Sequence, residues 1–237
     1  MARKLKVVIE EARSEVLMVS PYFVPGKDGV RWLKKMADRG VKLRIITNSF
    51  VSNDETLAQI AYMRYRKDLL RMGADVHELK PTPVQLQRDQ ERSTLAGDLI
   101  QLGGGLIQLG GGLLQLGGSF TQLGGSSKGA LHAKSFVLDR QVLFVGSFNF
   151  DPRSERLDTQ DGIVIRSPEL AARAAALFDK GATPAYTYRV SLLGGNDLLW
   201  VTEENGKGVH YYNEPLSRFW HRLSMRCLSL ITPESMM

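Results

Sequence analysis

The chain has 237 residues, and its hydrophobic fraction of 43% and charged fraction of 24% are ordinary for a globular protein. A net charge of +6 favours partners that carry negative charge, such as phosphate backbones or anionic lipid headgroups. Cys227 is the only cysteine, which excludes an internal disulfide and a cysteine metal cluster, and no apolar stretch is long enough to predict a transmembrane helix.

Strands alternate with helices in the first third of the chain. Short apolar runs predict strands, and apolar residues at helical spacing predict helices that end at Gly40 and Gly73. Asp54 is a candidate N-cap for the second helix. The alternation predicts a parallel or mixed sheet with helices on its faces. In chain order the elements are a strand at 15–20, a helix at 29–40, a strand at 41–48, a helix at 55–72 and a strand at 74–81.

A short repeat interrupts this pattern. The unit x-x-x-Gln-Leu-Gly-Gly occurs four times between Asp98 and Gly125, with a period of seven. It does not predict a coiled coil, because paired glycines in every unit are costly in a helix. We expect a flexible surface loop, since four such units bury little area; a small stacked β array is the alternative.

Strands return after the repeat. A turn at Asp139 and Arg140 is expected to join two strands, and Pro168 and Gly181 bound a later helix. The predicted elements are strands at 133–139, 142–147 and 161–167 and a helix at 168–181.

The segment 215–231 reads as a basic amphipathic helix. We expect this helix to dock its apolar face on the domain; an interfacial anchor on anionic lipid is the alternative. Its arginines, at four-residue steps, are Arg218, Arg222 and Arg226, and its apolar face carries Leu216, Phe219, Trp220, Leu223, Cys227, Leu230 and Ile231.

His132 and Lys134 form the strongest candidate site. Residues two apart on a strand share a face, so the two side chains are expected to project together. An imidazole beside an ammonium group suits attack on a phosphate ester, because the lysine neutralises the non-bridging oxygens while the histidine acts as nucleophile or proton donor. Asn149 can donate to the same oxygens, and Ser147 can hold the loop or the phosphate.

The spacing of these residues resembles the H-K-D motif of the phospholipase D superfamily. His132-x-Lys134-x-x-x-x-Asp139 is followed, after six residues, by Gly146-Ser147-x-Asn149. Further stretches, among them "SPYFVPG" and "GSFNFDPRS", are similar to the C-terminal half of bacterial cardiolipin synthases of the phospholipase D type. The resemblance implies an α/β fold with a phospholipase D-like mixed sheet and helices on both faces, as a single domain over 1–237 with the low-complexity insertion at 98–125.

The resemblance also implies a phosphohistidine mechanism that needs neither metal nor cofactor. One motif's histidine attacks phosphorus, the other's protonates the leaving alkoxide, and water or an alcohol resolves the intermediate. His132 would be the nucleophile or the acid, and Lys134 and Asn149 would bind phosphate, with Ser147 beside them. Asp139 is expected to brace the turn.

The chain departs from the family pattern in its number of motifs. Members of this type carry two, whereas His77, His210 and His221 lie outside any such pattern, so His132 stands alone. The active site is therefore expected to be completed by a second copy in a homodimer or by a missing N-terminal half.

A second departure concerns the carboxylate that normally orients the catalytic histidine. The family usually has a glutamate eleven residues after the motif asparagine, where this chain has Gln160. An amide can orient the ring but cannot stabilise an imidazolium, and we place residue 160 on the strand beside the one bearing His132. Asp161 is the other histidine-orienting candidate, although it would face the opposite way unless the register slips by one residue.

We therefore expect a cardiolipin synthase-like phosphatidyltransferase or phosphodiesterase that acts on anionic phospholipid. One alternative is a dimeric single-motif phosphodiesterase of the nuclease type, although nucleic acid is the less favoured partner. Another is an inactive truncated fragment that only binds membranes or a partner. The expected location is the bacterial cytoplasm, peripheral at the inner membrane, because the chain shows neither a transmembrane span nor the apolar start of a signal peptide.

Overall fold

The computed structural model describes residues 2–53, 55–81, 131, 133–151 and 161–231. The chain divides into two units, Met1–Lys80 with Leu131–Met237, and Pro81–Ala130. The repeat at 98–125 falls in the second unit and lies outside the described residues, as does the candidate cap Asp54. The account below therefore concerns the first unit.

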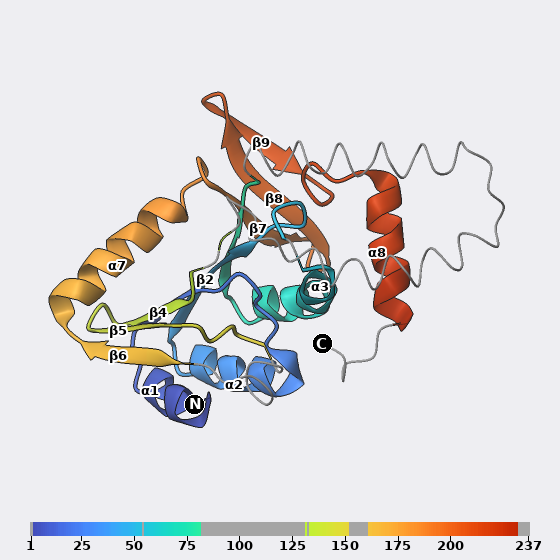
Figure 1. The fold of residues 1–237 in the computed structure, drawn as a ribbon. Helices are drawn as coiled ribbons and strands as arrows, with labels where there is room; N and C mark the ends of the chain where they lie inside the picture. The colour runs from blue at the N-terminus through green and yellow to red at the C-terminus, as the bar shows by residue number, and fades with distance from the viewer. Residues whose placement is uncertain (1, 54, 82–130, 132, 152–160, 232–237) are drawn as a thin grey trace. The chain divides into compact units, whose positions relative to one another are not determined.

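In the described residues nine strands form one mixed sheet, with the order β6-β5-β4-β1-β2-β3-β7-β8-β9 (Figure 1). The three strands β1, β2 and β3 are parallel to one another, and the remaining neighbours pair antiparallel. The predicted mixed sheet is confirmed. The strands are β1 (Glu15–Val19), β2 (Lys42–Asn48), β3 (Asp75–Leu79), β4 (Ser135–Leu138), β5 (Val142–Gly146), β6 (Gly162–Arg166), β7 (Thr187–Leu193), β8 (Asp197–Glu204) and β9 (Lys207–Tyr211).

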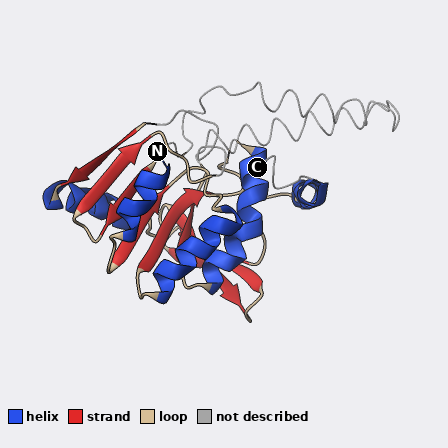
Figure 2. Ribbon diagram, turned by 90° about the horizontal axis from the view of Figure 1, so that it is seen from below, coloured by secondary structure: helices blue, strands red, loops and turns tan. Residues whose placement is uncertain are grey.

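Helices cover both faces of the sheet (Figures 1 and 2). On one face, α1 (Ala2–Glu10), α2 (Gly26–Asp38) and α3 (Thr56–Arg71) pack on a core that includes Met18 of β1 and Ile45 of β2. On the other face, α7 (Pro168–Gly181) packs on Leu17 and Ile46, the neighbours of those two residues in the strands. Since successive strand residues point to opposite faces, β1 and β2 are apolar on both sides.

The ends of the predicted helices follow from local chemistry. Gly40 and Gly73 follow α2 and α3 with φ angles of +86° and +88°, the left-handed conformation in which glycine ends a helix without strain. Ser167 caps α7, because its side chain accepts a hydrogen bond from the N–H of Leu170 at 3.4 Å. The predicted span 168–181 is confirmed.

The hairpin between β4 and β5 turns at the predicted residues. Asp139 and Arg140 have φ angles of 49° and 55°, and the N–H of Gln141 donates to the carbonyl of Leu138 at 2.8 Å. Two consecutive positive φ angles are typical of the tight turns that match the twist of hairpin strands.

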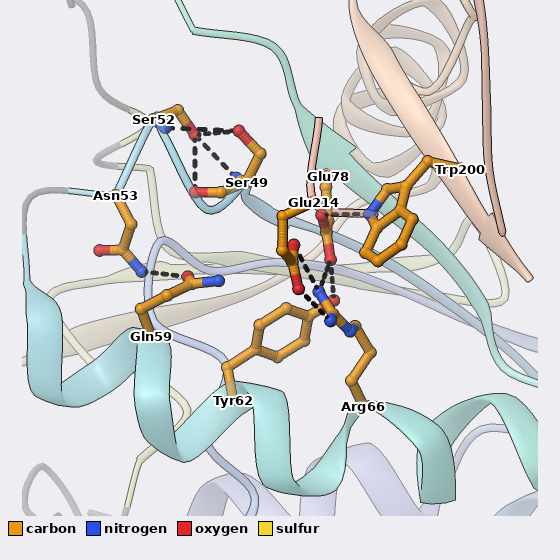
Figure 3. Close-up of polar contacts among 9 residues, drawn as sticks. All are labelled: Ser49, Ser52, Asn53, Gln59, Tyr62, Arg66, Glu78, Trp200 and Glu214. Atoms are coloured by element: carbon orange, nitrogen blue, oxygen red, sulfur yellow. Dashed lines mark hydrogen bonds and ion pairs between the residues drawn. The ribbon is translucent and has the colours of Figure 1, made fainter. Parts of the chain in front are cut away.

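A buried polar cluster attaches the C-terminal part of the chain to α3 (Figure 3). Arg66 of α3 donates to Glu78 of β3 at 2.8 Å and to Glu214 at 2.5 Å, and its guanidinium lies 4.8 Å from the ring centre of Trp200 on β8. Trp200 and the hydroxyl of Tyr62 also donate to Glu78. Burial raises the pKa of Glu78, although the Arg66 guanidinium opposes that rise.

The last described element is the helix α8 (Phe219–Ile231), which lies beside α3 (Figure 1). Among the helices of the described ranges, none combines the length and apolar character that crossing a membrane requires.

Candidate active site

The motif residues gather at one edge of the sheet. Because β4 runs antiparallel to β1, its first residue, Ser135, pairs with Val19 at the end of β1. Ser135 also pairs with Val145 near the end of β5, and Gly146 pairs with Gly162 at the start of β6. The end of β1, the start of β4 and the Gly-Ser segment after β5 therefore meet at the same edge.

Lys134 lies one residue before β4 and is buried, with 7% of its surface exposed. Its carbonyl accepts a hydrogen bond from the N–H of Gly146 at 3.2 Å, which ties the motif lysine to the Gly-Ser segment. We expected His132 and Lys134 to lie within a strand, but β4 begins only at Ser135. His132 lies outside the described residues, so its pairing with Lys134 stays a prediction.

Asp139 lies at the opposite end of β4 from Lys134, and its carboxylate binds the chain at the start of β1. Its carboxylate accepts hydrogen bonds from the N–H groups of Arg13, Ser14 and Glu15 at 2.8 to 2.9 Å and from the Ser14 hydroxyl at 2.7 Å. Partial burial would raise the pKa of Asp139, but these hydrogen bonds outweigh it and hold the pKa below its usual range. Asp139 thus joins the β4–β5 turn to the start of β1.

Close packing at the ends of β5 and β6 requires the glycine of the Gly-Ser-x-Asn segment. A Cβ atom on Gly146 would lie 2.5 Å from the carbonyl oxygen of Asp161 and 2.8 Å from the ring of Phe144. A Cβ atom on Gly162 would lie 2.4 Å from the same ring. Two glycines therefore let β5 and β6 pair across the buried Phe144 side chain.

Ser147 bonds to the main chain of Asp161. Its hydroxyl accepts from the Asp161 N–H at 3.0 Å and donates to the Asp161 carbonyl at 3.3 Å, and its own N–H donates to that carbonyl at 2.8 Å. These bonds fix the main chain immediately after Gln160. The Ser147 hydroxyl donates its one proton to the carbonyl of Asp161.

Asn149 lies between two buried aromatic residues, Phe148 and Phe150. Phe150 stacks on Phe23 with ring centres 4.7 Å apart, and its N–H donates to the hydroxyl of Ser20 at 3.3 Å. The segment that carries Asn149 is thereby held to the residues after β1. The Oδ1 atom of Asn149 is buried and has no hydrogen-bond partner within the described part of the chain.

The strand that follows Gln160 is not adjacent to β4. Sequence spacing placed residue 160 on the strand next to the one bearing His132, but β6 pairs with β5, and β5 separates it from β4. Gln160 precedes β6 and lies outside the described residues, while Asp161 is exposed just before that strand. The spacing could not reveal this, because the hairpin formed by β4 and β5 places both of its strands between β1 and β6.

Asn48 belongs to the site and was not singled out from the sequence. It is fully buried at the end of β2, where its Oδ1 accepts from the N–H of Leu131 at 3.3 Å and its Nδ2 donates to the carbonyl of Pro21 at 3.4 Å. Leu131 directly precedes His132 in the chain. A polar residue that ends an apolar parallel strand was the available signal, since such ends form ligand sites in open α/β sheets.

Comparison with known proteins identifies related domains. A family model described as "Cardiolipin synthase, PLD-like domain" matches residues 5–90 and 114–181. Cardiolipin synthase C of Escherichia coli (strain K12) is 34% identical over 217 residues, which cover 92% of this chain and 40% of that protein. An uncharacterized protein of Helicobacter pylori (strain J99) is 29% identical over 226 residues, which cover 95% of this chain and 38% of that protein. The chain spans about two fifths of the length of these relatives.

A solved structure shares the fold. The phospholipase D family member Nuc from Salmonella typhimurium superposes with a TM-score of 0.51 at 18% sequence identity, over 81% of this chain and 91% of that one. At this identity the similarity concerns the fold alone.

Proposed function

This chain belongs to the phospholipase D superfamily, in the PLD-like domain family of cardiolipin synthase, and from this premise we propose that it supplies one motif of a phosphatidyltransferase site. The observation that carries the proposal is the buried Lys134, joined by its main chain to the Gly146 segment at the edge where the parallel strands end. An ammonium group at a site of low polarity interacts strongly with a phosphate anion.

In the proposed reaction His132 uses an imidazole nitrogen to attack the phosphorus of a phospholipid. The bond to the leaving alkoxide breaks as the nitrogen–phosphorus bond forms, and a second histidine donates the proton that the alkoxide takes up. The Lys134 ammonium neutralises the charge of the non-bridging oxygens, and the amide of Asn149 donates a hydrogen bond to them. The second histidine, now neutral, takes the proton from the hydroxyl of a second phosphatidylglycerol or from water. That oxygen bonds to phosphorus as the nitrogen–phosphorus bond to His132 breaks, which releases the product.

The remaining motif residues would position rather than react. Asp139 braces the turn at the far end of β4, and Ser147 holds the main chain of Asp161. We propose that Ser147 keeps the phosphate-binding loop in place and that Gln160 or Asp161 orients the histidine.

The second histidine must come from outside the single motif. Of the other histidines, His77 lies between Asp75 and Thr187 inside the sheet, and His221 packs on the ring of Phe50. We propose that a second copy of the chain completes the site, or that another segment carries the second motif where this sequence is part of a longer protein.

The test is turnover of phosphatidylglycerol vesicles and of the soluble substrate bis(p-nitrophenyl) phosphate by purified variants. His132→Ala should abolish turnover of both substrates, and Lys134→Ala should reduce it by at least about a hundredfold, the scale of losing one oxyanion donor. His210→Ala and Lys35→Ala are the matched controls, because both residues are exposed and lie outside the motif. Turnover that survives His132→Ala would refute the proposal.

Two further arms of the same assay separate the alternatives. Gln160→Glu should raise the rate at least about tenfold, because a carboxylate stabilises the imidazolium that forms during the reaction. Faster cleavage of single-stranded DNA than of lipid would favour the nuclease-type phosphodiesterase. A chain that turns over none of these substrates, with or without the glutamate, would be the inactive fragment.

A further inference from the structure

The helix α8 exposes its apolar face. Trp220 is 75% exposed, Phe219 is 61% exposed and Leu223 is 40% exposed, and Leu216 just before the helix is 49% exposed. We call these four residues the α8 face. The expectation that the helix docks its apolar face on the domain is therefore wrong for these residues, although the opposite side of the helix does pack.

The packed side of α8 holds the helix in a defined position. Met225 is buried, and the ring of His221 meets the ring of Phe50 edge-on with centres 4.7 Å apart. Arg64 of α3 donates to the carbonyl of Ser229 near the C-terminal end of α8. The α8 face is therefore part of a fixed surface.

The chain that leads into α8 is anchored as well. Glu214 is buried against Arg66 of α3 (Figure 3). Its carbonyl accepts a hydrogen bond from the Ser217 hydroxyl at 2.6 Å. Arg222 then donates to the Ser217 carbonyl at 2.7 Å, which closes the first turn of the helix over this connection. The segment before α8 and the C-terminal part of the helix are thus both attached to α3, and the four side chains of the α8 face remain 40% to 75% exposed.

The charge of the segment is of one sign. Residues 215–231 contain Arg218, Arg222 and Arg226 but no aspartate or glutamate. A twofold contact between two copies of this face would oppose like charges and would carry a Coulomb cost. An anionic surface is complementary to the same residues, and Trp and Phe beside arginine are the side chains that favour a bilayer interface.

The packed side of α8 adjoins residues that lie next to the motif in the sheet. The loop after β2 touches α8 through Phe50, and Asn48 at the end of the same strand bonds to Leu131, the residue before His132. The helix α8 therefore lies next to the end of β2, at the edge of the sheet where the motif lies.

We propose that the α8 face docks on an anionic lipid bilayer and presents the edge of the sheet that carries the motif to the phospholipid headgroups. The proposal rests on the proposed lipid function and adds the surface through which the lipid is reached. Trp220 and Phe219 enter the headgroup region, and Arg218 meets the anionic phosphates.

Binding to vesicles tests this surface without any turnover. The full chain should co-sediment with vesicles of phosphatidylglycerol and phosphatidylcholine mixed in equal parts, and more weakly with phosphatidylcholine alone. Trp220→Ala and Phe219→Ala should each weaken partitioning about tenfold, the scale of one buried aromatic side chain. Arg218→Gln should weaken it about fivefold on the anionic vesicles alone, and less at high salt.

The controls come from α7, which also exposes an apolar and a basic side chain. Leu177 is 71% exposed and the Arg173 side chain 74% exposed, so Leu177→Ala and Arg173→Gln make comparable changes on another helix. Both should bind vesicles as the wild type does. Equal losses from the α7 and α8 variants, or no binding to anionic vesicles by the wild-type chain, would overturn the proposal.

Two readouts separate docking from catalysis and from self-association. His132→Ala should bind vesicles like the wild type while it loses turnover, so a failure of the catalytic proposal leaves this test intact. If the chain cleaves the soluble phosphodiester but does not bind vesicles, the proposed docking surface is wrong while the proposed catalysis stands. Should Trp220→Ala convert a dimer into a monomer in sedimentation without any effect on vesicle binding, the face would belong to a second copy.

Discussion

Asp139 joins two parts of the chain that lie 124 to 126 residues apart. Its carboxylate receives hydrogen bonds from three consecutive N–H groups at the start of β1, and so the β4–β5 turn cannot move away from that strand. Hydrogen bonds to a charged acceptor are stronger than neutral ones. The aspartate of the motif therefore acts here through the position of β4, at the end remote from Lys134.

Asp139→Asn should lower the free energy of unfolding by about 1–2 kcal/mol near neutral pH, because the amide loses charge and one acceptor oxygen. The pKa of Asp139 is lower in the folded state than in the unfolded state, so its contribution is complete above the unfolded value of about 4. It is lost as the pH falls through the folded pKa. The difference between wild type and variant, measured by urea unfolding, should therefore shrink at acidic pH.

The matched control is Asp197→Asn, which changes an exposed carboxylate at the start of β8. Its effect should stay below that of Asp139→Asn at every pH. A difference for Asp139→Asn that is constant from neutral to strongly acidic pH would contradict a role for the ionised carboxylate.

Sequence spacing predicted some members of the site and not others. Lys134 and Asn149 stand out because a motif is a pattern of nearby positions, and the turn at Asp139 follows from the apolar runs on either side. Asn48 and Ser20 support the site through hydrogen bonds to residues 83 and 130 positions away. Such contacts depend on the order and register of the strands, which periodicity within one segment does not determine.

Among the elements, those with strong periodicity and clear end signals were predicted, whereas the hairpins β7, β8 and β9 were missed. The turn signals were present in the sequence, as Gly194-Gly195 and Asn205-Gly206. The three glycines have positive φ angles. Asn205 also has a positive φ, of 51°, which suits the two-residue turn that joins β8 to β9. The antiparallel pairing of β7 with β3 could not be predicted, because it joins strands separated by the repeat and α7.

Arg66 connects these strands and the segment before α8 to helix α3. Its guanidinium is buried between Glu78 and Glu214, so two carboxylates share one counter-ion (Figure 3). Arg66→Met should destabilise the protein by about 3–5 kcal/mol, because it leaves buried carboxylates unpaired. The measurement is urea unfolding at neutral pH.

Arg71→Met on the same helix is the control for the Arg66 variant. Arg71 forms an ion pair with Asp68, but the two side chains are 49% and 46% exposed, and solvent screens the pair. Its loss should cost less than about 1 kcal/mol. Equal effects of the two variants would mean that the buried cluster contributes no more than a surface ion pair.

The sheet extends beyond the part of the chain that the family model matches. The family model matches residues up to 181, and β7, β8, β9 and α8 follow that boundary. The domain carries one catalytic motif, so the proposed mechanism requires a second motif in the assembled enzyme. The number of motifs that meet is therefore a property of the assembly, and mixing experiments can measure it.

Subunit mixing distinguishes a site made by two copies from a site within one chain. If each active dimer uses His132 from both copies, a ninefold excess of His132→Ala chain leaves only about one tenth of the wild-type chains paired with another wild-type chain. Activity per wild-type chain should then fall about tenfold after exchange, while a ninefold excess of His210→Ala should add activity instead. Sedimentation of the wild-type chain should show a dimer under the same conditions. The two-copy site would be contradicted if excess His132→Ala chain left the activity per wild-type chain unchanged and the protein sedimented as a monomer. A single motif would then suffice for both steps of the reaction.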